Sequence, residues 1–124
     1  MNREENMILI EPLKRALEIV KIFNGLGREQ LAFLMKTEYP NRKPDMDIDK
    51  LLRMKLIFST DDSVHIPGRS CNKNIRQTVE IMLEICGCDF FIFDKSKKPF
   101  LLDFIVIRND KAHKYCVGEY NGIS

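Results

Sequence analysis

The carboxylates of the C-terminal half are the side chains that could do hydrolytic chemistry. They are Asp89, Asp94, Asp103 and Glu119. Metal-dependent nucleases gather such groups around a divalent ion that activates water. A restriction-endonuclease-like site also needs an acidic residue and a lysine two apart on the next strand. Asp103 is followed by Phe104-Ile105 and Glu119 by Tyr120-Asn121, so the lysine is missing. We therefore predict that the chain is not an enzyme, and a degenerate nuclease-like lobe is the third hypothesis.

Cysteine and histidine are the residues that could bind zinc. The chain has Cys71, Cys86, Cys88, Cys116, His65 and His113. Paired Cys-x-x-Cys spacing is absent, and the Cys-x-Cys of Cys86 and Cys88 is an uncommon ligand spacing. Cys86 also fits the apolar face of a predicted helix, where a free cysteine packs as a small hydrophobic residue. We predict no metal and no cofactor.

The remaining chemistry is phosphate binding by lysine and arginine, which supplies most non-specific affinity for DNA. The predicted DNA contacts are Lys50 and Arg53 in one helix, Arg42 and Lys43 in the loop before it, and Lys95, Lys97 and Lys98 in a basic turn.

Acidic residues stand close to these predicted contacts. Asp45, Asp47 and Asp49 lie near the start of the same helix, and Asp61-Asp62 lies in a turn beyond it. Residues 1–66 hold 11 basic and 11 acidic groups, whereas residues 67–124 hold 9 and 7. The half that is predicted to read DNA is therefore the less basic half.

The N-terminal half is expected to position these residues on three helices. Apolar spacing predicts helices over about 11–23 and 28–36. A third helix is predicted to begin at Asp45 or Asp47, either of which can serve as its N-cap, and to end near Leu56. Short strands at 57–59 and 64–66 flank an acidic turn. Three helices followed by a tight hairpin are typical of a winged helix-turn-helix, here over 11–68. In such domains the third helix enters the major groove and the hairpin contacts the DNA backbone.

The C-terminal half, residues 69–117, is predicted to form a fourth helix at about 75–86 and a three-stranded antiparallel sheet. The strands are expected over 89–94, 100–108 and 112–117. The first two are almost continuously apolar, so we expect both faces of the sheet to be covered. The predicted fold class is α+β, with the sheet and its helix packed on the winged helix as a single compact unit.

Composition limits the class of protein. The chain has 124 residues, 44% of them hydrophobic, and a net charge of +2. These values are those of one small globular domain. No apolar run is long enough for a signal peptide or a membrane helix. We therefore expect a cytoplasmic protein with reduced cysteines and no membrane partner.

The order of elements resembles a family. Three features carry the resemblance: a third helix followed by Lys55-Leu56-Ile57-Phe58, a helix over Arg76–Ile85, and strands that contain Phe90–Phe93 and Pro99–Phe104. This order of elements is similar to that of small bacterial proteins of conjugative and mobile elements. Replication-relaxation-type proteins share this plan, and the likeness covers about residues 11–117. It implies an accessory, DNA-associated role.

The sequence thus favours a non-enzymatic DNA-binding accessory or regulatory protein of a bacterial mobile element, with double-stranded DNA as its partner. The alternative is a protein–protein adaptor that keeps the winged-helix scaffold without binding DNA. A homodimer is a further hypothesis, because an exposed Phe-rich sheet favours edge pairing or face packing.

Overall fold

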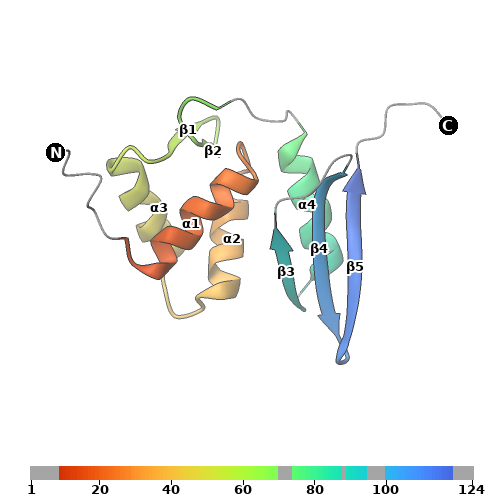
Figure 1. The fold of residues 1–124 in the computed structure, drawn as a ribbon. Coiled ribbons are helices and arrows are strands. Elements are labelled where there is room, and N and C mark those ends of the chain that lie inside the picture. The colour runs from red at the N-terminus through yellow and green to blue at the C-terminus, as the bar shows by residue number, and fades with distance from the viewer. Residues whose placement is uncertain (1–8, 70–73, 88, 95–99, 119–124) are drawn as a thin grey trace. The chain divides into compact units, whose positions relative to one another are not determined.

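The computed structural model describes residues 9–69, 74–87, 89–94 and 100–118. In these residues the chain forms four helices, a two-stranded sheet and a three-stranded sheet, both antiparallel (Figure 1). The α+β prediction is therefore confirmed. The chain divides into two compact units, Met1–Lys73 and Asn74–Ser124, which we call unit 1 and unit 2.

Three helices form the body of unit 1 and contact one another in pairs. They are α1 (Glu11–Ile22), α2 (Arg28–Glu38) and α3 (Pro44–Arg53). Their buried side chains make the core together with Phe23, which directly follows α1. The largest of those on the helices are Leu13, Ile19, Leu31, Leu34, Met35, Ile48 and Leu51. Burying such side chains is the main favourable contribution to folding.

The predicted start of the third helix was wrong. Its first residue is Pro44, its N-cap is Lys43, and no side chain caps it. Proline suits the first helical position because its missing N–H would have no partner there and its φ is already helical. Neither Asp45 nor Asp47 is therefore the cap.

A β-hairpin completes unit 1. It consists of β1 (Phe58–Thr60) and β2 (Ser63–His65), joined by Asp61 and Asp62. Both turn residues have positive φ, as a two-residue type I′ turn requires. On its other side, β2 pairs with the segment between α1 and α2. Val64 N–H donates to the Leu26 carbonyl at 2.9 Å, and Gly27 forms an antiparallel bridge with Ser63.

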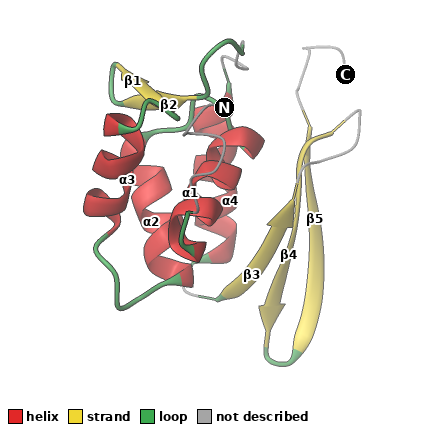
Figure 2. Cartoon of the chain, turned by 60° about the vertical axis from the view of Figure 1, so that its left-hand side comes forward, coloured by secondary structure: helices red, strands yellow, loops and turns green. Residues whose placement is uncertain are grey.

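Unit 2 contains α4 (Ile75–Cys86) and a sheet of β3 (Phe90–Asp94), β4 (Phe100–Arg108) and β5 (Lys111–Gly118). The strand order is β3-β4-β5, and every pairing is antiparallel. Asn109 and Asp110 connect β4 to β5, again with positive φ at both positions. Figure 2 shows β4 between its two neighbours.

One face of this sheet is buried. Phe91 pairs with Val106 and Phe93 pairs with Phe104, so these four buried side chains point to the same side. That side faces α4, because the Arg108 side chain of the same face donates to the Ile85 carbonyl at 2.8 Å. The opposite face carries Ile92, which is 52% exposed. The prediction that both faces are covered was therefore wrong at this position.

Candidate nucleic-acid interface

The outer face of α3 brings together the two predicted helix contacts. Ile48 and Leu51 are buried in the core. Met46, Lys50 and Arg53 are exposed, and their spacing of four and three residues places them on one stripe of the helix. The structure therefore positions the Lys50 and Arg53 side chains on a common surface. Met46 belongs to the same stripe and was not singled out from the sequence.

Asp47 is the one buried carboxylate of α3, and Arg42 binds it with two hydrogen bonds. Arg42 Nη2 donates to Oδ1 at 2.7 Å and Nε donates to Oδ2 at 3.0 Å. The hydrogen bond with Asp47 raises the pKa of Arg42, so the guanidinium stays charged. This bidentate geometry anchors the loop before α3 to the helix. Arg42, which the sequence predicted to contact DNA from the loop before α3, therefore binds Asp47 of the same unit.

Asp45 and Asp49, one turn apart on α3, share Arg28 from the first turn of α2. Arg28 Nη2 lies 2.9 Å from Asp49 Oδ1 and 3.4 Å from Asp45 Oδ1. The hydrogen bond with Asp49 is the main reason that the pKa of Arg28 is raised. Nothing in the local spacing indicates this contact, because the partners are 17 and 21 residues apart.

The three carboxylates of α3 thus all have an arginine partner from another segment. Lys43, Lys50 and Arg53 are exposed, and within residues 9–69 none of them forms an ion pair. Around α3 the carboxylates therefore have arginine partners, whereas these three cations have no acidic partner within residues 9–69. The predicted contacts Lys95, Lys97 and Lys98 lie outside the described residues.

The hairpin beside this face is acidic at its tip and aromatic on one side. Asp61 and Asp62 are exposed. The Phe58 and His65 rings stack with centroids 5.0 Å apart, and Thr60 Oγ1 lies 3.0 Å from His65 Nε2. The carbonyl of Asp62 accepts a hydrogen bond from Arg28 N–H at 2.7 Å, which fixes the hairpin to the start of α2.

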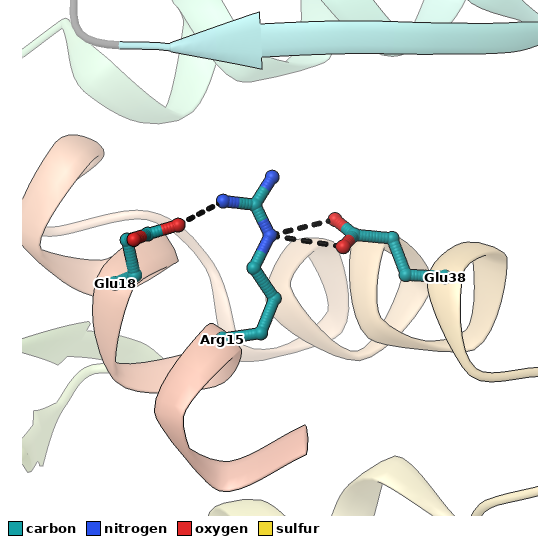
Figure 3. A network of polar contacts seen from close by, with 3 residues as sticks. All are labelled: Arg15, Glu18 and Glu38. Atoms are coloured by element: carbon teal, nitrogen blue, oxygen red, sulfur yellow. Dashed lines mark hydrogen bonds and ion pairs between the residues drawn. The ribbon is translucent and has the colours of Figure 1, made fainter. Parts of the chain in front are cut away.

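The end of α2 is held to α1 by a second network (Figure 3). Arg15 Nε lies 2.9 Å from both carboxylate oxygens of Glu38, and Arg15 also pairs with Glu18. Partial burial alone would lower the pKa of Arg15, but the two carboxylates raise it overall. The two helices on which α3 packs are therefore joined by charge as well as by their apolar core.

Other kinds of site find little support in the described part of the chain. No three His, Cys, Asp or Glu side chains there come close enough to hold a metal ion. Cys86 is buried, and burial raises the pKa of its thiol to about 11, whereas Cys116 is exposed. None of the described helices has the length and apolar character needed to cross a membrane.

Comparison with protein-family models, curated proteins and solved structures gave no match for this chain. The geometry of α3 and its arginine partners is therefore the basis on which a function can be assigned.

Proposed function

We propose that unit 1 is a winged helix-turn-helix that binds double-stranded DNA without enzymatic activity, as an accessory or regulatory protein. The order of three helices and a hairpin supports this assignment. The pairing of β2 with Leu26 and Gly27 supports it further, because it adds a short third strand between the first two helices.

The observation that carries the proposal is the charge arrangement of α3. A helix that enters the major groove must bring side chains to base edges without facing carboxylates toward phosphates. Arg28 and Arg42 pair with the carboxylates, and Lys50 and Arg53 are left exposed on one stripe. We assign these two cations to phosphates along the groove, and Lys43 to the phosphates next to them.

A protein–protein adaptor is the second candidate, favoured by two other features of unit 1. Met46 is 65% exposed at the N-terminal end of the same stripe of α3, and an apolar side chain there also suits a protein partner. The carboxylates of Asp61 and Asp62 at the hairpin tip would repel a phosphate backbone and would attract a basic protein.

Duplex titration separates the two candidates. The full chain is titrated against a fluorescent random-sequence duplex at low salt, with fluorescence anisotropy as the readout. The double variant Lys50→Ala/Arg53→Ala should weaken binding by roughly tenfold or more, because it removes two cationic contacts. The matched control Lys14→Ala/Lys21→Ala removes two exposed lysines of α1 and should change affinity little.

The two candidates predict opposite results in this titration. Binding that falls only in the α3 variant supports the DNA-binding function. If the wild-type chain does not bind the duplex at low salt, the DNA proposal fails and the adaptor replaces it. Equal losses in both variants would show that α3 is not the interface. Membership of a mobile-element family, a cytoplasmic location and a homodimer stay predictions.

A further inference from the structure

The outer edge of β5 has no strand partner in the described part of unit 2. β5 pairs with β4 on one side, and no other described strand pairs with it (Figure 1). Lys111, Ala112, His113, Lys114 and Cys116 are exposed along it. An edge strand of this length presents backbone N–H and C=O groups that a further extended segment can pair with.

The charge of the β5 edge limits which kind of strand can pair with it. β5 has two lysines and no carboxylate, and neither lysine forms an ion pair within residues 74–118 as far as the structure describes them. A second copy of the chain paired antiparallel on β5, in the register that sets Lys111 opposite Lys114, would place lysines of the two copies directly opposite each other. Like charges on neighbouring strands are destabilising. The edge therefore disfavours a second copy and favours an acidic strand.

We propose that β5 binds an extended acidic segment of another protein by strand addition. The register gives the pattern that such a segment needs. Lys111 lies opposite Arg108 and Lys114 lies opposite Ile105, so the two lysines project from opposite faces of the sheet. A partner strand with two carboxylates three residues apart can place one beside each lysine. This surface is in unit 2 and does not depend on DNA binding by α3.

Three synthetic peptides test the proposal with the full chain. The acidic peptide acetyl-TVETVETV-amide has glutamates three residues apart. One control replaces both glutamates with lysine, and another replaces the central threonine with proline, which removes a backbone donor. In nitrogen–proton correlation spectra, the acidic peptide should shift the amide signals of Lys111–Cys116 and slow their hydrogen exchange. Neither control peptide should do so.

A charge exchange provides the decisive variant. Lys111→Glu/Lys114→Glu should weaken binding of the acidic peptide by about tenfold and should allow the lysine peptide to bind, because each cross-strand pair changes sign. The same exchange at Lys14 and Lys21 of α1 is the control and should change neither affinity. The proposal fails if the β5 signals do not respond to the acidic peptide, if the lysine or proline peptide binds equally well, or if exchanging the charges leaves the preference unchanged.

Discussion

The two units of this chain use charged side chains differently. In unit 1, three arginines bind carboxylates that belong to other turns or other segments: Arg15 with Glu18 and Glu38, Arg28 with Asp45 and Asp49, and Arg42 with Asp47. In the described part of unit 2, Arg108 and Asp89 form an ion pair at 2.6 Å beside a largely apolar contact of α4 with the sheet.

This difference shows why a count of charges does not describe a surface. Residues 1–66 are neutral, yet the carboxylates of α3 are paired with arginines from other segments, and Lys50 and Arg53 of α3 are exposed. In unit 2, the lysines of β5 lie on an edge that contains no carboxylate. Each unit can attract another molecule at those exposed charges that have no ion-pair partner in the described structure.

The largest effects should come from the apolar cores, on which both units depend. Phe23 in unit 1 and Phe104 in unit 2 are each 1% exposed. Phe23→Ala and Phe104→Ala should each lower the free energy of unfolding by about 3–5 kcal/mol, because each leaves a cavity. Urea titration measures the loss, and amide exchange shows where protection falls. The Phe104 variant should lose protection in α4 and β4. Loss confined to α1–α3 would contradict the core assigned to unit 2.

The next effect should come from the ion pair of Arg42 with the buried Asp47 in unit 1. Arg42→Ala should destabilise the chain more than Asp47→Asn does, because it leaves the buried Asp47 carboxylate without its partner. Asp47→Asn leaves a half-exposed guanidinium that water can hydrate. Thermal unfolding at neutral pH compares the two variants, with exposed Lys43→Ala as the control. A smaller loss for Arg42→Ala than for Asp47→Asn would show that the pair does not hold α3 as described.

A smaller loss is expected at the ion pair of Arg108 with Asp89 in unit 2. Arg108 donates to Asp89 at 2.6 Å and to the Ile85 carbonyl at 2.8 Å, but both charged side chains are partly exposed. Arg108→Gln should therefore destabilise the chain less than Arg42→Ala does, because exposed pairs contribute little. The same thermal unfolding experiment measures this order. The reverse order would mean that unit 2 also depends on its charges.

The smallest effects should be gains at the two hairpin turns. Asp62 and Asp110 occupy the second position of their turns with φ of 63° and 62°, a conformation that favours glycine. Asp62→Gly and Asp110→Gly should each raise the free energy of unfolding by roughly 0.5–1 kcal/mol. Urea titration detects such a gain. A loss of stability in either variant would indicate that the aspartate side chain itself supports the turn.

The sequence predicted most of the elements and few of their polar contacts. The helices and all five strands were predicted within a few residues, because apolar periodicity and turn residues act locally. The partners Arg28 and Arg42 were not recognised, since their pairing with α3 depends on how helices and loops meet in space. The exposure of Ile92 was missed for a related reason, because a continuous apolar strand does not tell how many of its faces are covered.

The salt dependence of duplex binding tests the central claim most directly, namely that Lys50 and Arg53 on α3 contact DNA phosphates. The logarithm of the association constant falls linearly with the logarithm of salt concentration, by about 0.9 for each phosphate contact. Lys50→Ala/Arg53→Ala should make this slope shallower by about 1.8, and Lys14→Ala/Lys21→Ala should leave it unchanged. A slope that is the same in the wild type and the α3 variant would contradict the account.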